Sequence, residues 1–262
     1  LISVSSICGQ TPNEIINSEA VSLYDSIGLK NKIYSLLENS KLIMVGEMHG
    51  TKEPAAMVQS MAESILEFEN SVSIGLEILP DLMQNNKLSD SISLLETDYF
   101  QSPNTDGRRS RAWFELVLMA SKNSKINLFF FDAIGAQRDS LMYENIRLQR
   151  TINPQNKIIT LSGNYHSRLK PVGGIKTMGV FASADSFYKS KELLSVMHFY
   201  GEGTMINNRG NGLELFEVKF QKSALNNGVK MENYLLYLET LTMDYLNVFF
   251  YTKKVTASRS VK

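Results

Sequence analysis

Four nearly continuous apolar runs stand out along the first part of the chain. They are KLIMVG (41–46), VSIGLE (72–77), INLFFFDA (126–133) and KIITLSG (157–163). Short runs without polar alternation are typical of strands that are buried on both faces of a sheet. We therefore predict four central strands, and expect most of them to be parallel.

Between these runs, the hydrophobic positions change to a helical period. Apolar residues recur on one face of a predicted helix over 55–69, at Met57, Met61, Ile65 and Phe68. Two further helices are predicted over 109–122 and 138–152. Strands that alternate with helices indicate an α/β fold, here a mixed, mostly parallel central sheet flanked by helices.

The pattern changes after residue 163. Apolar segments separated by turns rich in Gly and Asn predict extra short strands, at MGVFAS, LLSVMHFYGEGTMIN, LELFEVKF and YLNVFFYTKK. A helix over about 231–240 is predicted to interrupt them, and the polar stretch 101–111 to form a surface loop. No long run of Pro, Ser or Gly divides the chain, so we expect residues 13–262 to form a single α/β domain.

Composition excludes several classes of protein. The 262 residues carry 27 Lys and Arg and 27 Asp and Glu, so the formal net charge is zero. Without an excess of basic charge, nucleic acid is not an expected partner. No apolar run approaches the roughly 18 residues of a transmembrane helix. The single cysteine, Cys8, leaves histidine and carboxylate side chains as the ligands of any bound metal.

The first residues allow two interpretations. LISVSSICGQTPNE begins with apolar and small residues and continues into a polar segment. Residues 1–12 are therefore expected to be either a disordered terminus or the remnant of a signal peptide, and the second implies a periplasmic or extracellular protein. Lipidation of Cys8 is disfavoured, because Ile7 is larger than the small residue that usually precedes a lipidated cysteine.

Two of the predicted strands end in the same short motif, Gly-x-x-His. KLIMVGEMHG contains Glu47 and His49, and KIITLSGNYHS contains His166. Glu77 ends a third predicted strand. Because the C-terminal ends of parallel strands meet at one edge of a sheet, we expect these side chains to share a site. Imidazoles and carboxylates together suit acid/base catalysis, either alone or around a metal ion.

The charge on His49 is expected to depend on the helix that follows it. A helix that begins near Thr51 places the positive end of its dipole beside the imidazole and disfavours the protonated ring. A neutral ring is what a general base or a metal ligand requires.

The predicted helix over 138–152 contributes a cation. It opens with Arg138 and Asp139, and Asn145 lies on the same face as Arg138. The face expected to be buried carries Leu141, Leu148 and Ile152. An arginine at a helix start opposes the helix dipole, so we expect a buried carboxylate or an anionic group of a substrate to hold it there. Asp139 suits the dipole and is assigned that structural role.

These motifs resemble a known superfamily. GEMHGTKE, GLE, RDSLMYENI and GNYH, in this order, resemble the superfamily that joins erythromycin-esterase-like proteins, ChaN-like haem-binding lipoproteins and the Tiki/TraB group. The R-D-x-x-M-x-x-N-I run is most similar to the esterase branch, whereas the spacing of Glu47 and His49 resembles the ChaN and Tiki pattern. The motifs cover less than half of the chain.

The resemblance implies a mixed α/β fold with the two Gly-x-x-His motifs facing each other across a cleft. In the esterase branch, the residues that match His49, Glu77 and His166 activate water for ester hydrolysis without a metal. In the Tiki branch, the same residue types are thought to hold a divalent metal ion for peptide hydrolysis. The ChaN-like branch binds haem, but its axial tyrosine matches no single position here, so haem is the less favoured cofactor.

The first functional hypothesis is a hydrolase that cleaves an ester or amide bond in a small molecule or peptide. His49 activates water, Glu77 orients the ring or shares its proton, and His166 assists as acid, base or second ligand. Arg138 stabilises negative charge that develops on the substrate. The alternative is an exported protein of ChaN-like type that uses the same cleft to bind haem or a metal ion without catalysis.

Other polar residues receive smaller roles. Glu47 is a further catalytic candidate, and Tyr165 and Asn145 are candidates for substrate contacts. His198 lies inside a predicted strand without the glycine motif, which favours a structural role. The basic cluster in the 101–111 stretch is predicted to be solvated, and the alternative is that it admits an anionic substrate; its members are Arg108, Arg109 and Arg111.

Overall fold

The computed structural model describes residues 11–22, 34–84, 87–208, 210–219, 229–237 and 246–261. The expectations for the first ten residues, including Cys8, lie outside the described residues.

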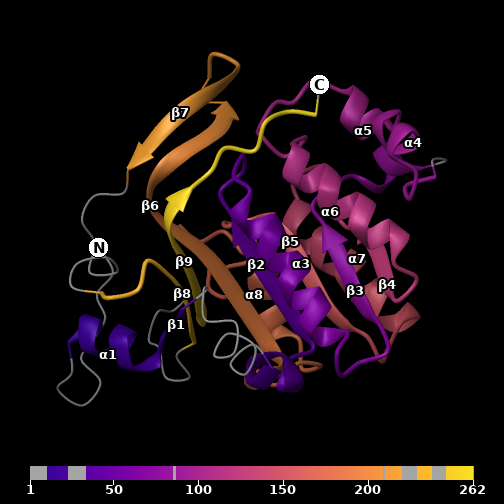
Figure 1. Cartoon of the computed structure of the whole chain (residues 1–262). Coiled ribbons are helices and arrows are strands. Elements are labelled where there is room, and N and C mark those ends of the chain that lie inside the picture. Colours follow the sequence, from indigo (N-terminus) through magenta and orange to yellow (C-terminus); the bar gives the residue numbers. More distant parts are fainter. Residues whose placement is uncertain are drawn as a thin grey trace.

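The strands of the described part form one sheet of nine strands (Figure 1). Their bounds are β1 (Val21–Ser22), β2 (Leu42–Glu47), β3 (Val72–Leu76), β4 (Ile126–Phe130), β5 (Lys157–Gly163), β6 (Leu193–Asn208), β7 (Leu213–Lys219), β8 (Asn233–Tyr237) and β9 (Val248–Val255). The helices are α1 (Pro12–Glu19), α3 (Glu53–Ile65), α4 (Ser91–Leu95), α5 (Asp98–Gln101), α6 (Arg111–Lys122), α7 (Arg138–Ile152) and α8 (Met178–Ala184), with short 3-10 turns at η1 (Pro80–Met83) and η2 (Ser190–Glu192).

The sheet is mixed and mostly parallel, so the predicted fold class is confirmed. Its order is β1-β8-β9-β6-β2-β5-β3-β4, and β7 pairs with β6 beside this path. The pairs from β9 to β4 are all parallel, whereas β7, β8 and β1 are joined by antiparallel pairs. Each of the four apolar runs forms one of the strands β2, β3, β4 and β5, as predicted.

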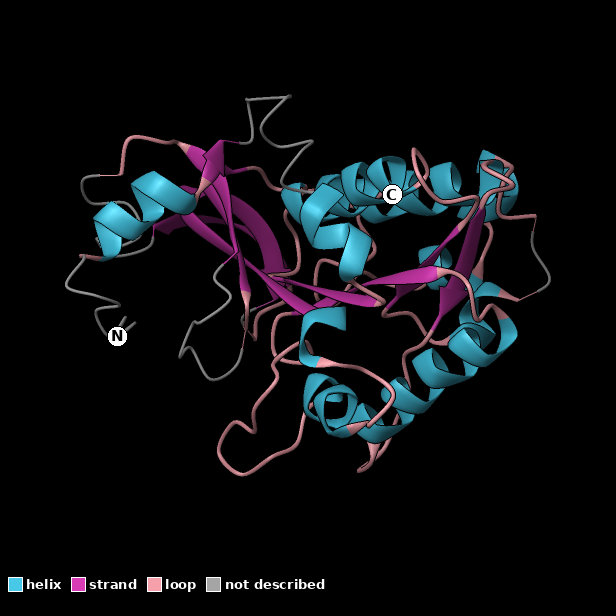
Figure 2. Ribbon diagram, turned by 90° about the horizontal axis from the view of Figure 1, so that it is seen from below, coloured by secondary structure: helices cyan, strands magenta, loops and turns pink. Residues whose placement is uncertain are grey.

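Helices cover both faces of the parallel region (Figure 2). Neighbouring residues of a strand point to opposite faces of the sheet, so the side chains of β2 enter the core on one face and the core on the other in turn. Ile43 and Val45 point into the core shared with α3 and α6, whereas Leu42 and Met44 point into the core shared with α7 and α8. All six residues of β2 are buried. A strand covered on both sides reads as a continuous apolar run.

One predicted strand is a helix. MGVFAS lies within α8, and the preceding Thr177 caps this helix by accepting a hydrogen bond from the backbone N–H of Val180 at 3.3 Å. Gly179 permits close packing there, since a β-carbon would lie 2.4 Å from the carbonyl oxygen of Arg168. The cap and the close packing, rather than the apolar run, determine the local structure.

The prediction of a helix over 231–240 is also wrong for the part of this segment that the structure describes. Residues 233–237 form β8, which pairs with β9 and β1, and residues 238–240 lie outside the described residues. Tyr234 stacks on Tyr251 of β9 with ring centroids 4.9 Å apart. Burial against neighbouring strands has overridden the helix propensity of this segment.

The helix over 138–152 has the predicted bounds but not the predicted buried face. Leu141, Leu148 and Ile152 are exposed by 43%, 58% and 62%. The buried side chains include Met142 and Ile146. Asp139 lies on the same face as these two, and it binds His166. Polar contacts in the site therefore set the rotation of α7 about its axis.

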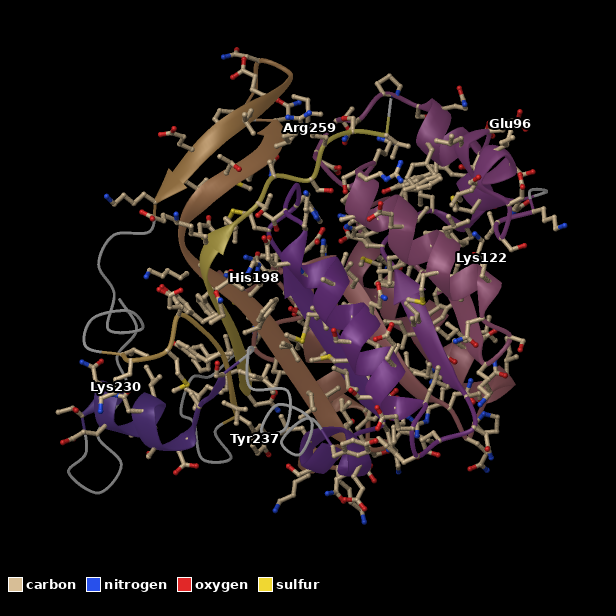
Figure 3. All side chains as sticks on the ribbon, in the orientation of Figure 1. Glu96, Lys122, His198, Lys230, Tyr237 and Arg259 are labelled. Carbon is tan, nitrogen blue, oxygen red and sulfur yellow. The ribbon has the colours of Figure 1, made fainter. Side chains whose placement is uncertain are left out.

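The predicted strands of the second half are otherwise present as β6, β7 and β9. His198, which is labelled in Figure 3, lies on β6 and is 3% exposed. Its ring stacks on Phe250 of β9. Its Nε2 atom lies 2.8 Å from Oγ1 of Thr252. Burial lowers the pKa of His198 to about 3, so the ring is neutral, in agreement with a structural role. Within the described ranges, no helix is both long and apolar enough to cross a membrane.

Candidate active site

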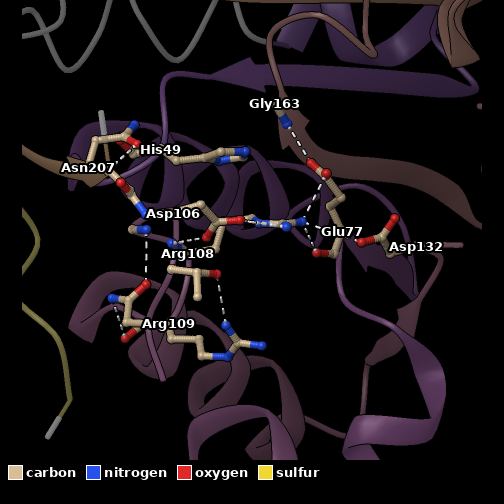
Figure 4. A network of polar contacts seen from close by, with 12 residues as sticks. His49, Glu77, Asp106, Arg108, Arg109, Asp132, Gly163 and Asn207 are labelled. Carbon is tan, nitrogen blue, oxygen red and sulfur yellow. Dashed lines mark hydrogen bonds and ion pairs between the residues drawn. The ribbon is translucent and has the colours of Figure 1, made fainter. Parts of the chain in front are cut away.

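The C-terminal ends of β2, β5 and β3 bring together the polar residues predicted to share a site. Glu47 pairs in register with Gly163, and Glu77 follows the last residue of β3. Asp132 follows β4, the next strand of the sheet. Figure 4 shows the imidazole of His49 reaching toward Glu77 and Gly163. Parallel pairing thus gathers groups that are far apart in sequence at one edge of the sheet.

His49 is held by the carboxylate of Glu47. The Nδ1 atom of His49 lies 2.8 Å from Oε1 of Glu47, and the indole N–H of Trp113 donates to the same oxygen at 3.1 Å. Glu47 is 1% exposed, whereas the side chain of His49 is 20% exposed. With Nδ1 directed at the carboxylate, Nε2 is the nitrogen left to accept a proton.

The pKa of His49 departs from its ordinary value in the direction opposite to the one predicted. Burial lowers the pKa, but the hydrogen bond and charge of Glu47, together with the charge of Glu77, outweigh burial and raise it. Helix α3 begins at Glu53, close to the expected start, but the carboxylate of Glu47 contacts the ring directly. Burial raises the pKa of Glu47, because His49 and Trp113 only partly compensate for the loss of water.

Glu77 lies at the centre of the site and is 1% exposed. Its Oε1 atom lies 2.5 Å from Nη2 of Arg138 and 2.9 Å from Nη1 of Arg108. Its Oε2 atom accepts the backbone N–H of Gly163 at 2.7 Å. Burial raises the pKa of Glu77, but Arg108, His49 and His166 lower it further than burial raises it. Glu77 is therefore an ionised carboxylate.

Gly163 lies in close contact with His49 and Glu77. A β-carbon at this position would lie 3.1 Å from Nε2 of His49 and 3.7 Å from Oε2 of Glu77. The glycine of the second Gly-x-x-His motif thus allows the imidazole of the first motif to approach β5 closely.

His166 is oriented from both sides. Its Nδ1 atom lies 2.8 Å from Oδ1 of Asp139, and its Nε2 atom lies 3.3 Å from Nη1 of Arg138. A guanidinium group can only donate hydrogen bonds, so Nε2 accepts from Arg138 and the proton is on Nδ1, directed at Asp139. Asp139 also accepts the backbone N–H of Met178 at the start of α8. It therefore positions His166, a role that the dipole argument missed.

Arg138 is held by carboxylates, as its unfavourable place at a helix start predicts. Its Nε atom donates to Asp132 at 2.8 Å, and its Nη2 atom pairs with Glu77. Burial lowers the pKa of Arg138, but Asp132 and Glu77 raise it further, so the side chain remains charged.

Arg108 is the main site residue that sequence reasoning missed. Its Nη2 atom lies 2.6 Å from Asp106, and its Nη1 atom contacts Glu77 and, at 3.4 Å, Asp132 (Figure 4). The side chain is 18% exposed, so the prediction of a solvated arginine is wrong for this residue. By contrast, Arg111 is 60% exposed and pairs with Glu115 on its own helix. Neither residue type nor local pattern distinguishes these two arginines.

Three solved structures are similar to the chain in fold. A protein from Bacillus cereus has a TM-score of 0.75 at 10% sequence identity, covering 97% of this chain and 100% of that chain. A succinoglycan biosynthesis protein has a TM-score of 0.64 at 10% identity, with coverages of 95% and 97%. A mutant of the erythromycin esterase EreC in its open conformation has a TM-score of 0.62 at 11% identity, with coverages of 88% and 95%.

The chain has the erythromycin-esterase fold. This finding agrees with the resemblance seen in the motifs. No protein-family model matches the chain, and no curated protein matches it in sequence. At 11% identity, the likeness to EreC concerns the fold alone, so the reaction must be argued from the side chains of this chain.

Two predicted substrate contacts have other partners in this erythromycin-esterase fold. The Asn145 side chain donates to the carbonyl oxygen of Phe131 at 3.2 Å, which ties α7 to the segment after β4. Tyr165 packs its ring edge-on against His166, with centroids 5.8 Å apart. These contacts tie Asn145 to the fold and place Tyr165 against the ring of a site histidine, and a contact of either residue with a substrate stays a prediction.

The metal-dependent alternative requires His49, His166 and Glu77 to act as ligands. Among the described residues, no group of three or more His, Cys, Asp or Glu side chains is arranged to hold a metal ion. Glu77 already accepts hydrogen bonds on both oxygens, and Nε2 of His166 faces Arg138. The guanidinium groups of Arg108 and Arg138 would repel a divalent cation at Glu77. The residues present therefore do not fit this metal site.

Proposed function

We propose that the protein is a hydrolase that cleaves an ester or amide bond by metal-free activation of water. The observation that carries this proposal is the different hydrogen bonding of the two imidazoles. His49 is bound at Nδ1 by Glu47 and holds Nε2 beside Gly163, 3.1 Å from where a β-carbon would lie. Nε2 of His166 is instead occupied by Arg138. His49 is thus the imidazole able to take a proton from water.

The roles of the other residues follow from their contacts. Glu47 stabilises the imidazolium that forms when His49 accepts the proton, and a raised pKa makes His49 a stronger base. Glu77 is ionised and fixed by two arginines, so it favours positive charge on His49. Arg138 can turn an N–H group from His166 to the oxygen of the tetrahedral intermediate, where negative charge develops.

His166 completes this arrangement as a proton donor. When Arg138 turns to the substrate, Nε2 of His166 can take up a proton from solvent, and the carboxylate of Asp139 stabilises the resulting imidazolium. The protonated ring of His166 can then donate this proton to the leaving group, and His49 releases to solvent the proton that it took from water. The net reaction adds the elements of water across the cleaved bond, giving a carboxylic acid and an alcohol or amine.

Hydrolysis of generic substrates tests this proposal. The purified protein is assayed with p-nitrophenyl butyrate and a matching anilide, before and after dialysis against a chelator. We expect turnover that survives dialysis, and a preparation without stoichiometric metal or a Soret band. Absence of turnover on both substrates, or loss of turnover that added zinc or manganese restores, contradicts the proposal.

A further inference from the structure

A groove separate from the candidate active site lies between the second half of α7 and residues 185–188. Its volume is about 760 Å³. Arg138 opens α7 in the active site, whereas Arg150 lines the groove from the last turn of the same helix. Twelve residues separate them, which is about 18 Å along the helix axis. The groove is therefore distinct from the hydrolytic site.

Arg150 is a buried cation that forms no close ion pair in the described part of the chain. It is 7% exposed, and its guanidinium carbon lies 3.9 Å from the ring centroid of Phe187 and 5.0 Å from that of Tyr188. Its Nε and Nη1 atoms have no hydrogen-bond partner among the described residues. Stacking on aromatic rings compensates only partly for the removal of a charged group from water.

The acidic side chains of the groove already have other partners. Glu144 pairs with Arg147 at 2.8 Å. Asp185 accepts the hydroxyl of Tyr143 at 2.5 Å and the backbone N–H of Phe187 at 2.8 Å. Arg147 and Arg150 both act on the charge of Asp185 and lower its pKa, but no carboxylate of the described residues forms an ion pair with Arg150.

A second donor and an apolar wall lie next to this charge. Tyr188 is 9% exposed, and its hydroxyl oxygen has no hydrogen-bond partner among the described residues. Burial raises the pKa of Tyr188 by more than the neighbouring Arg150 lowers it, so the hydroxyl keeps its proton. Phe187 and Leu148 are exposed by 51% and 58% and provide apolar surface in the same groove.

We propose that this groove binds a small-molecule carboxylate attached to an aromatic body. The carboxylate pairs with the guanidinium of Arg150 and accepts the hydroxyl of Tyr188, and the aromatic body packs on Phe187 and Leu148. A planar carboxylate matches the fork of a guanidinium group. The half-exposed ring of Phe187 covers the guanidinium and turns aside as the carboxylate enters.

Calorimetric titration with naphthoate tests the proposal, with neutral naphthylmethanol as the matched ligand. We expect naphthoate to bind at one site per chain, and the alcohol to bind at least about tenfold more weakly, because it lacks the charge-assisted hydrogen bonds. Arg150→Gln should weaken naphthoate by a similar factor. The control is Arg111→Gln, which removes an exposed arginine from α6 and should leave affinity unchanged.

Three results would overturn the proposal: no binding of naphthoate, equal affinity for the neutral alcohol, or unchanged affinity in Arg150→Gln. If Arg150→Gln does not fold, Phe187→Ala replaces it, since a half-exposed ring contributes less to folding. We expect that variant to bind naphthoate several-fold more weakly, and unchanged affinity there also contradicts the proposal. Binding is measured without turnover, so the result is independent of the proposed hydrolysis.

Discussion

The Nδ1 atom of His49 lies 2.8 Å from a carboxylate oxygen of Glu47, only two residues earlier in the chain. The pair spans the end of β2, and its carboxylate is completely buried while the imidazole is partly exposed. A buried carboxylate of this kind fixes the ring orientation and increases its basicity. His166 has a similar carboxylate partner in Asp139, but Arg138 occupies its Nε2 atom, so His49 is the base in the proposed reaction.

Glu47→Gln should move the acid limb of the pH–rate profile to lower pH. Glu47 opposes the effect of burial on His49 and raises the pKa of the ring. Without that charge, burial lowers the pKa, so the ring stays unprotonated at a more acidic pH. The plateau of kcat/KM should fall by about tenfold or more, because a weaker base remains. The measurement is kcat/KM from about pH 5 to 9, and an unmoved acid limb would show that Glu47 does not tune the base.

Arg108→Gln should lower the free energy of unfolding at neutral pH by about 3 kcal/mol, because it leaves Glu77 with one cationic partner fewer in a buried site. The lowered pKa of Glu77 contributes stability above its unfolded value of about 4.3, and this contribution is lost as the pH falls. The difference between variant and wild type should therefore narrow in acid. Urea denaturation at several pH values measures it, with the exposed Arg111→Gln as control.

The central strands could be predicted from the sequence, whereas the place of Arg108 in the site could not. Continuous apolar runs identify β2, β3 and β5 because burial on both faces leaves a local mark in the sequence. Glu47 and Glu77 were predictable site residues because each stands at the end of one of these apolar runs. Arg108 lies in a polar loop, and only the folded chain brings it to Glu77, which is 31 residues away. No local pattern carries that information.

Helix α7 shows a second limit. Its bounds were predictable from periodicity, but two apolar faces compete in its sequence. Met142 and Ile146 are buried and Leu148 is exposed, because Asp139 must reach His166. The choice between the faces depends on a tertiary contact, so hydrophobic spacing alone selected the wrong one. The helix predicted at β8 was wrong for a similar reason, because this segment pairs as a strand with β9 and β1, which are distant in the sequence.

Gly163→Ala should lower kcat/KM by about tenfold or more, because misplacement of a base by a fraction of an ångström is costly to catalysis. The added methyl group would lie 3.1 Å from Nε2 of His49, which must move away from the water that it activates. Steady-state kinetics measures the effect. Ser162→Ala is the matched control, since the neighbouring side chain of β5 points to the other face of the sheet. Equal rates in both variants would contradict the close approach of His49 to β5.

His198→Gln should reduce the acid sensitivity of the fold. The pKa of His198 is about 3 in the folded protein, so the unfolded chain binds an extra proton between that value and about 6.5. Stability is therefore fully present above about pH 6.5 and falls with decreasing pH, by at most about 1.4 kcal/mol per pH unit. Chemical denaturation at pH values across this window should give a flatter profile for the variant. An identical slope would mean that His198 is not neutral in the folded protein.

The rate of ester hydrolysis by His49→Gln decides whether His49 is the base. The substrate is p-nitrophenyl butyrate, and His198→Gln, which changes a histidine outside the site, is assayed beside it at neutral pH. We expect His49→Gln to fold, as judged by its circular dichroism, and to lose about 100-fold or more in kcat, while His198→Gln retains the rate of the wild type. A folded His49→Gln variant with the rate of the wild type would contradict the assignment of His49 as the base.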